Sequence, residues 1–501
     1  MKPFLDARTL PHHTEIATDL AIIGGGPAGI SLALALSNTP IRVLLLESGG
    51  MAFDARTQKL YRGTETGVAY LPLDATRLRY LGGSTNHWGG WCRPLDEDDF
   101  EKREWVAHSG WPFPRKTLEP YFARAQALCE AGPFLYDKLA APAATMAPLL
   151  NLGAGGVYTS FFQFSQWKDN PQHLPTHFGE RYAADLKQLA NLTVMLHANV
   201  TGLRLAADAN SLDHLDVATL SGKRFTVRAR YAVVATGAIE TARLLLASND
   251  VMTTGVGNQN DRVGRYFADH AIPRDTATLV SFGGNLAPYY GNNAVAEDTH
   301  FRATFSPTQA FKRQRRVLGS LVTVEQQTKL DELATAAVSE TSATLGVDAS
   351  GATAYSLGCG IELMPDPDRR LTLAGERDAL GMPRLELAMR ISDDDFARYR
   401  ETLRELGRQL LAARTGMIRL DCKTREEWLA VMDWGSHHLG TARMHDDPKQ
   451  GVVDADSKVH GITNLFVAGS SVFPTYGSSN PTMNLVALVL RLADHMKGLF
   501  A

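Results

Sequence analysis

The sequence predicts an α/β fold, α+β overall, in which a discontinuous Rossmann-like domain is assembled from separated segments and a second domain is built on an antiparallel sheet. Three observations support this prediction. A strand, a glycine-rich turn, a helix and a second strand follow one another between residues 18 and 47. Two further strand-to-glycine segments lie far along the chain, and short β-type runs fill the region between them.

The N-terminal unit carries the GxGxxG signature of a dinucleotide-binding turn. In such a turn Gly24 would allow the tight bend, Gly26 the close approach of a pyrophosphate, and Gly29 the packing of helix on strand. Glu47 ends the second strand, where a carboxylate can accept hydrogen bonds from ribose hydroxyls. The spacing predicts a bound dinucleotide but does not distinguish FAD from NAD, since both use this turn.

Two later segments are expected to complete the same Rossmann-like domain. Residues 230–237 form an apolar run that ends in glycine and leads into a helix, and residues 464–469 repeat that form. The second is followed by a loop and by a long apolar helix from Pro481 to about Met496, with Asn480 as its N-cap.

The region between these segments is expected to form a second domain. Runs at 316–324, 355–364 and 370–373 are typical of strands, and 393–413 is predicted as an amphipathic helix. Residues 334–354, rich in Ala, Ser and Thr, are expected to form a loop, either mobile over the site or plain surface.

Bulk composition excludes several classes of protein. The chain has 44% apolar and 21% charged residues and a formal net charge of −3. It therefore has no net positive charge that would attract nucleic acid or an anionic membrane. No apolar stretch is long enough to span a bilayer and no secretory signal is visible, so a cytoplasmic location is expected, with export together with a partner subunit as the alternative. The four cysteines form no CxxC or CxxCH pair, which disfavours an iron–sulfur cluster, a structural zinc or a c-type haem, and no metal is predicted.

Motifs spread along the chain resemble those of the glucose–methanol–choline (GMC) oxidoreductases. They are a flavin loop at 82–94, a second signature at 237–246, VGRYFADH at 263–270, and HHLGTARM at 437–444 followed by SNPT at 479–482. The pattern is most similar to the branch of pyranose 2-oxidase, C-glycoside 3-oxidases and bacterial sugar dehydrogenases. The resemblance implies FAD as cofactor, and a substrate domain with a six-stranded antiparallel sheet and flanking helices.

The resemblance also assigns domains and cofactor contacts. Residues 15–97, 191–274 and 430–501 are expected to form the FAD-binding domain, and 98–190 and 275–429 the substrate-binding domain. The predicted cofactor-binding residues are Gly24, Gly26, Pro27, Ala28, Gly29, Glu47, Ser48, Gly83, Ser84, Asn86, His87, Trp88, Gly89, Val200, Ala235, Gly237, Gly469, Asn480, Pro481 and Thr482.

Oxidation of an alcohol removes a proton from oxygen and a hydride from carbon, and histidine is the natural base near neutral pH. By resemblance, His437 is the active-site histidine and Asn480 its polar partner, the two holding a substrate hydroxyl beside flavin N5. His438 is the rival for the base, because adjacent residues in an extended segment face opposite ways. Glu362, in an apolar run, is expected either to contact a sugar hydroxyl or to be salt-bridged at a strand edge.

His87 has two interpretations. It occupies the position that carries a covalent flavin bond in the pyranose-oxidase pattern, but Ser84-Thr85-Asn86 replaces the usual intervening residues. The alternative is a histidine hydrogen-bonded within a tight glycine-rich loop.

The predicted activity is oxidation of a hydroxyl-bearing carbon of a sugar, glycoside or related alcohol, with oxygen, a quinone or a protein as electron acceptor. A lyase on the same fold, or a FAD subunit that passes electrons to a separate haem protein, remain alternatives. A homo-oligomer or a small-subunit partner is compatible with the sequence.

Overall fold

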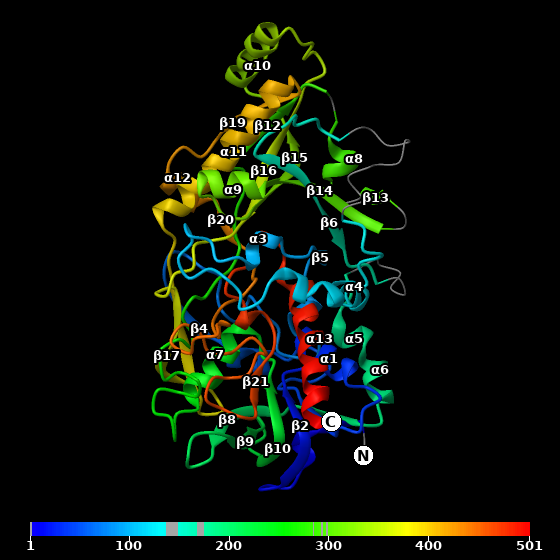
Figure 1. Ribbon diagram of the computed structural model, residues 1–501, viewed down its shortest axis with the longest axis vertical. Coiled ribbons are helices and arrows are strands. Elements are labelled where there is room, and N and C mark those ends of the chain that lie inside the picture. Colours follow the sequence, from blue (N-terminus) through cyan, green and yellow to red (C-terminus); the bar gives the residue numbers. More distant parts are fainter. Residues whose placement is uncertain (1–2, 137–148, 168–174, 284, 292–293, 297–298) are drawn as a thin grey trace.

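The computed structural model describes residues 3–136, 149–167, 175–283, 285–291, 294–296 and 299–501. Two large sheets follow one another along the long axis of the molecule, and a small three-stranded sheet lies beside the lower one (Figure 1). The predicted mixed α/β class is confirmed.

The lower sheet is the dinucleotide-binding sheet, and its strands come from both ends of the chain. Its order is β1 (Phe4–Asp6), β7 (Leu192–Leu196), β3 (Val43–Leu46), β2 (Glu15–Ile23), β10 (Arg224–Val234), β9 (Leu212–Ala218) and β8 (Asn199–Leu205), with β21 (Leu465–Val467) also paired to β10. All pairs are parallel except those that involve β9. Because β21 pairs with β10, which ends more than 200 residues before it in the sequence, the sheet is discontinuous, as the sequence predicts.

Three helices pack around this sheet and bring loops to the carboxyl ends of its strands. They are α1 (Pro27–Ala35), α7 (Gly237–Ala247) and the C-terminal α13 (Pro481–Phe500), which is red in Figure 1. Helix α1 is apolar on every side because it lies between the sheet and α13, with which it is in contact. Helix α13 begins at the predicted residue and continues past Met496 to Phe500.

The upper sheet is antiparallel throughout the described residues. Six strands of five or more residues lie side by side in the order β19 (Gly416–Leu420), β12 (Ala277–Ser281), β16 (Thr353–Ile361), β15 (Ser320–Thr328), β14 (Thr299–Pro307) and β6 (Val157–Phe164). The short strands β5 (Trp91–Cys92), β11 (Ala271–Pro273), β13 (Ala294–Ala296) and β20 (Met432–Trp434) extend it to ten. The predicted six-stranded sheet is therefore its central part.

Strands also connect the segments that the sequence assigns to different domains. Strands β5, β11 and β20 belong to segments predicted for the FAD-binding domain, yet they pair within the antiparallel sheet. The three-stranded sheet joins β4 (Gly63–Gly67) to β17 (Arg370–Arg377) and β18 (Pro383–Met389). The domain boundaries themselves stay a prediction.

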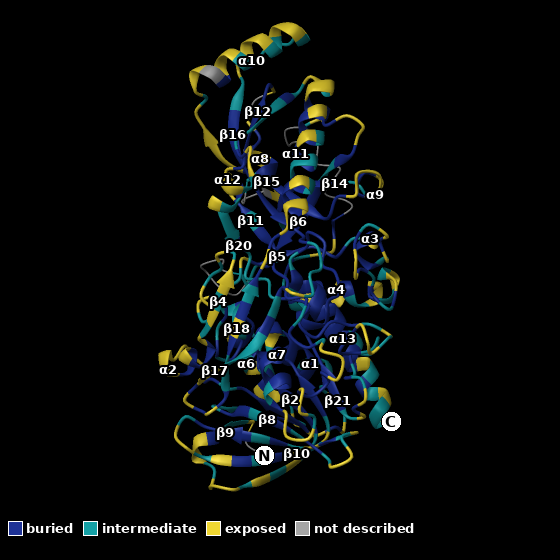
Figure 2. Ribbon diagram, turned by 90° about the vertical axis from the view of Figure 1, so that its left-hand side faces the viewer, coloured by how far each residue is buried: buried dark blue, intermediate teal, exposed yellow. Residues whose placement is uncertain are grey.

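The helices outside the two sheets confirm one prediction and correct another. Helix α11 (Asp393–Ala413) has the predicted bounds, and a capping box between Ser392 and Asp395 begins it. The loop predicted over 334–354 is wrong. Most of it is helix α10 (Glu332–Leu345), which projects from the end of the molecule with an exposed outer face (Figure 2). Alanine favours the helical conformation, and α10 is capped by Asp331 at its N-terminus and by Gly346 at its C-terminus.

The remaining helices are short and lie between the strands. They are α2 (Ala55–Gln58), α3 (Glu97–Phe100), α4 (Glu119–Leu128), α5 (Phe178–Arg181), α6 (Ala183–Gln188), α8 (Ala287–Tyr290), α9 (Gln309–Arg315) and α12 (Arg425–Ala430). Among the residues that the structure describes, none of the helices has the length and apolar character needed to cross a membrane.

Candidate active site

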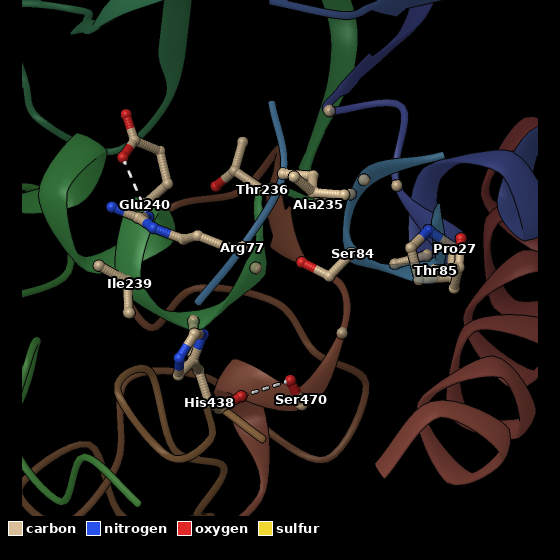
Figure 3. Close-up of a pocket in the computed structure, with 18 of the residues that line it drawn as sticks. Pro27, Arg77, Ser84, Thr85, Ala235, Thr236, Ile239, Glu240, His438 and Ser470 are labelled. Atoms are coloured by element: carbon tan, nitrogen blue, oxygen red, sulfur yellow. Dashed lines mark hydrogen bonds and ion pairs between the residues drawn. The ribbon is translucent and has the colours of Figure 1, made fainter. Parts of the chain in front are cut away.

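A cavity of about 420 Å³ lies at the carboxyl ends of β2 and β10, beside the first turn of α13. Loops from distant parts of the chain meet in it, as expected for a ligand site at the end of a parallel sheet. Figure 3 shows Pro27 and Thr85 on one side, Arg77 and Glu240 on another, and His438 and Ser470 from the C-terminal segments.

Most of the residues predicted to bind the cofactor line this cavity. The lining includes Gly24, Gly26, Pro27, Ala28, Glu47, Ser48, Gly83, Ser84, His87, Trp88, Gly89, Val200, Ala235, Gly237, Gly469, Asn480, Pro481 and Thr482, and also His437 and His438. Gly29, Asn86 and Glu362 are not part of it. The predicted residues are thus gathered in one place although they span most of the chain.

The glycine turn after β2 has the steric properties of a phosphate cradle. A Cβ on Gly29 would lie 1.9 Å from the carbonyl oxygen of Gly24, so only glycine lets α1 approach the strand this closely. Gly24 has a φ of +108°, which disfavours any residue with a side chain. A Cβ on Gly26 meets nothing within 4 Å, which leaves the N-terminus of α1 open to the cavity. Free space before a helix N-terminus fits a pyrophosphate.

Glu47 is held in place by backbone amides of two loops. Its carboxylate accepts hydrogen bonds from Gly25 N at 2.8 Å and from Gly49 N at 2.7 Å. The side chain is 4% exposed and still lines the cavity. Because a carboxylate accepts about four hydrogen bonds, Glu47 keeps capacity for ribose hydroxyls.

Two predicted residues act on the shape of the loops and do not line the cavity. Gly29 packs α1 as described above. The Asn86 side chain donates from Nδ2 to the carbonyl of Leu81 at 2.9 Å, which closes the turn that begins the glycine-rich loop. Neither residue is part of the cavity lining.

The structure favours the salt-bridged alternative for Glu362, and the expectation of a substrate contact is corrected. Glu362 is 1% exposed, follows β16, and pairs with Arg103 at 2.9 Å. It also accepts a hydrogen bond from the Gly319 amide at 3.1 Å. Burial alone would raise the pKa of this carboxyl, but Arg103 lowers it below its ordinary value. A buried carboxylate with this partner is a structural ion pair.

At the other end of the cavity the structure brings His437 and Asn480 into contact. The Asn480 Nδ2 lies 3.1 Å from His437 Nε2. Asn480 occupies the N-cap position of α13, as predicted, but its side chain makes no capping hydrogen bond. Its amide is instead directed at the histidine. Burial lowers the pKa of His437 well below its ordinary value, so the ring is neutral at physiological pH.

The backbone of His437 is fixed by a buried carboxylate. Asp269 accepts the His437 N–H at 2.7 Å through one oxygen and the Tyr70 hydroxyl at 2.6 Å through the other. Burial raises the pKa of Asp269 to about 7, although Tyr70 and the backbone amides act in the opposite direction. Asp269 and Tyr70 therefore hold the segment that carries His437 against β11.

His270 touches His437, and the sequence did not single it out as a site residue. The Nδ1 atoms of the two rings are 3.0 Å apart, and His270 Nε2 lies 3.0 Å from the carbonyl oxygen of Gly477. Burial lowers the pKa of His270 to about 4. A signal was present, because His270 ends the VGRYFADH motif, but the motif says nothing about which side chain its histidine meets.

His438 has surroundings different from those of His437. Its ring lies 5.9 Å from that of Phe267, between centroids, and its Nε2 has no hydrogen-bond partner among the described residues although the atom is buried. Burial lowers the pKa of His438 to about 3. A partnerless ring nitrogen on the cavity wall is a further observation that a polar ligand fits here.

A buried ion cluster forms one wall of the cavity and was not predicted from the sequence. Glu240, on α7, pairs with Arg77 at 3.3 Å, with Arg79 at 3.1 Å and with Arg243 at 3.2 Å. Burial alone would raise the pKa of Glu240, but the three guanidinium groups lower it to about 2. The charges come from sequence positions far apart, and for that reason a local motif could not indicate the cluster.

Comparison with known proteins agrees with this geometry. A family model for "FAD dependent oxidoreductase" matches residues 19–328, and one for "GMC oxidoreductase" matches residues 365–488. The chain therefore belongs to the FAD-dependent oxidoreductases and its cofactor is FAD. Within that class, its C-terminal part, residues 365–488, is similar to the GMC oxidoreductases.

The chain is also similar to individual oxidases and dehydrogenases. The chain is 27% identical to 6'''-hydroxyparomomycin C oxidase of Streptomyces lividus, with 97% of this chain and 93% of that protein covered. It is 29% identical to the fructose dehydrogenase large subunit of Gluconobacter japonicus, over 54% of this chain and 47% of that subunit. Pyridoxine 4-oxidase of Mesorbium loti has the same fold, with a TM-score of 0.64 and 20% identity over 96% of this chain and 99% of that one.

Proposed function

We propose that this enzyme oxidises a hydroxyl-bearing carbon of a sugar, glycoside or related alcohol, with His437 as the base. The observation that carries the proposal is the contact between His437 Nε2 and the Asn480 amide at the end of the FAD cavity. A neutral imidazole nitrogen beside a hydrogen-bond donor is suited to take the proton of a hydroxyl whose oxygen the donor holds.

The roles of the protein groups follow from their positions. Asn480 orients the substrate oxygen, and His437 Nε2 accepts its proton. FAD, when bound, supplies the acceptor for the hydride that leaves the carbon. Backbone at Pro481 and Thr482, in the first turn of α13, lies where the positive end of the helix stabilises negative charge on the cofactor. Glu47, Gly26 and their neighbours hold the nucleotide part.

The names of two relatives support the substrate class. The chain resembles 6'''-hydroxyparomomycin C oxidase and the large subunit of a fructose dehydrogenase. The first name is that of an oxidase of a hydroxy compound, and the second that of a sugar dehydrogenase. The acceptor that reoxidises FAD belongs to the same proposal, with oxygen and a quinone or protein acceptor as the two candidates.

The test is an anaerobic screen of sugars, glycosides and small alcohols for loss of the visible flavin absorption. His437→Ala is expected to lower the rate of this bleaching by about 10²–10⁴-fold while FAD stays bound. His300→Ala, on β14 outside the cavity lining, is the matched control and should leave the rate unchanged. Fast bleaching in His437→Ala would contradict the proposal, and readmission of oxygen then distinguishes an oxidase from a dehydrogenase.

The covalent bond at His87 stays a prediction. The side chain is exposed and lines the cavity, and its backbone amide donates to Ser84. FAD that remains with the protein after acid precipitation, and is released from His87→Ala, is expected if the bond forms. Release of FAD from the unchanged enzyme supports the hydrogen-bonded alternative.

A further inference from the structure

We infer that His270 is a positioning residue that fixes the tautomer of His437, so that the Nε2 lone pair of His437 faces the substrate. The inference rests on the proposed role of His437 as base and deepens it. It comes from a chain of four hydrogen-bonding groups that runs from Asn480 to the Gly477 carbonyl.

The first end of the chain fixes the protonation of His270. The Gly477 carbonyl can only accept, so His270 Nε2, which lies 3.0 Å away, carries the proton. Since burial keeps His270 neutral, its Nδ1 is then unprotonated and must accept. The atom within reach is His437 Nδ1 at 3.0 Å, which therefore carries a proton and donates it.

The second end is compatible with the same assignment. The Asn480 amide nitrogen lies 3.1 Å from His437 Nε2, and an unprotonated Nε2 accepts its hydrogen. An amide turned by 180° would present its oxygen to a protonated Nε2 instead, so the His270 end of the chain decides between the two tautomers. Every hydrogen bond then donates in the same direction, from the Asn480 amide through both rings to the Gly477 carbonyl. Each contact pairs one donor with one acceptor.

The loop that holds both ends is rigidly placed. Gly477 and Asn480 are three residues apart, and a Cβ on Gly477 would lie 2.2 Å from a carboxylate oxygen of Asp99. The Tyr476 ring packs edge-on against His270 with centroids 4.9 Å apart. Its hydroxyl accepts the Leu363 amide at 2.8 Å. These contacts set the distance between the acceptor at Gly477 and the donor at Asn480.

The tautomer decides whether His437 can act. In the state described, a substrate hydroxyl that replaces the Asn480 amide at Nε2 would pass its proton to that nitrogen, and bound FAD would supply the acceptor for the hydride. His437 then holds both ring protons and one positive charge, with Nδ1–H still donated to His270. In the other tautomer Nε2 already carries a proton, so that no lone pair meets the substrate.

Two substitutions distinguish the acceptor that His270 presents to His437 from the donor that it presents to Gly477. His270→Asn places a carbonyl oxygen where Nδ1 stands, which keeps an acceptor for His437 but loses the contact with Gly477. His270→Gln places an amide nitrogen where Nε2 stands, which keeps the donor to Gly477 but removes the acceptor. A role in packing predicts that Gln, the larger side chain, is tolerated better. A role in the tautomer predicts the reverse.

The holoenzyme is labelled with ¹⁵N-histidine, and the His437 ring nitrogens are identified by comparison with His437→Ala. At neutral pH the unchanged enzyme is expected to show a protonated Nδ1 and an unprotonated Nε2. The same state is expected in His270→Asn, with flavin reduction within about 10-fold of normal. In His270→Gln, Nε2 becomes protonated in a large fraction of molecules and reduction slows by about 10²-fold or more.

Three results overturn the inference: the opposite tautomer in the unchanged enzyme, equal loss in both variants, or an unaltered tautomer in His270→Gln. The first needs no variant, so a failure of His270→Gln to fold leaves the inference testable. If His437→Ala is reduced rapidly, the proposed base is wrong, whereas the nitrogen spectra still report whether His270 sets the tautomer. The two failures are therefore distinguishable.

Discussion

The two ends of the cavity are built in different ways. At the nucleotide end, the turn Gly24–Ala28 lines the cavity largely with backbone, and Glu47 is held by amides beside it. At the other end, the side chains of His437 and Asn480 line the cavity and His270 lies behind His437, so that three distant segments meet only in the folded protein. The first end needs shape and the second needs a defined protonation state.

The difference follows from what each end binds. A pyrophosphate carries fixed charge, which a helix N-terminus and amides meet without any particular side chain. A hydroxyl proton must be taken by a group whose lone pair is free and correctly aimed. Such a group depends on partners, because a buried imidazole takes its tautomer from the hydrogen bond at its other nitrogen.

The largest effect is expected at the nucleotide end. Gly29→Ala would place a methyl group 1.9 Å from the Gly24 oxygen, so the turn must open and FAD is expected to be lost. Gly26→Ala is the matched variant, because its methyl group meets no protein atom within 4 Å and extends into the cavity. It should fold normally and bind FAD more weakly. FAD content from the ratio of visible to ultraviolet absorption measures both, and full FAD in Gly29→Ala would contradict the steric argument.

Substitution in the ion cluster around Glu240, which forms the wall between the two ends, is expected to lower the stability of the fold. Glu240→Gln removes the carboxylate that three arginines share, and the apparent free energy of unfolding is expected to fall by about 3–5 kcal/mol. Glu340→Gln, exposed on α10, is the control. Denaturant unfolding followed by circular dichroism measures the difference.

The pH dependence of that difference has a definite sign. The folded pKa of Glu240, about 2, lies below its ordinary value of 4.5, so the carboxylate stabilises the protein fully above pH 4.5. This contribution is lost as the pH falls through the interval down to about 2. The gap between the unchanged protein and Glu240→Gln should therefore narrow in acid, and a gap that is constant with pH would assign the effect to packing.

The contrast between the two ends also explains what could be read from the sequence. The glycine turn, Glu47 and helix α11 depend on neighbours in the chain, and pattern and capping chemistry predict them. His437 and Asn480 were found through resemblance to a family, since nothing local to either residue indicates a partner. His270 and the cluster around Glu240 were missed because their contacts join segments separated by more than a hundred residues.

Sequence patterns also left two roles open where one residue type can serve either role. Asn480 reads as an N-cap, yet its amide binds His437 and leaves the helix uncapped by a side chain. Glu362 in an apolar run is compatible with a ligand contact or with a salt bridge, and the structure pairs it with Arg103. In both cases tertiary contact decided among interpretations that the sequence leaves equal.

At the His437 end, Asn480→Ala removes the donor that is proposed to hold the substrate oxygen. Because the side chain makes no capping hydrogen bond, stability should change little. The rate of anaerobic flavin reduction is expected to fall by about 10–100-fold, as for loss of one or two hydrogen bonds. A large loss of stability, detected by thermal unfolding, would show that the residue serves the helix after all.

The smallest effect is the pH dependence of reduction in the unchanged enzyme. Burial, then the neighbouring rings of His270 and His438, hold the pKa of His437 well below 6.5, so the base is neutral from pH 8 to 6.5. The reduction rate should be flat over this interval and should decrease only in more acidic solution, where the ring gains a proton. Asn480→Asp places a carboxylate against Nε2, which favours the protonated ring and moves the decrease to higher pH. A decrease of the rate centred at or above pH 6.5 in the unchanged enzyme would mean that water hydrates the His437 ring and that burial does not lower its pKa. The His437 end of the cavity would then lack the defined protonation state that distinguishes it from the nucleotide end.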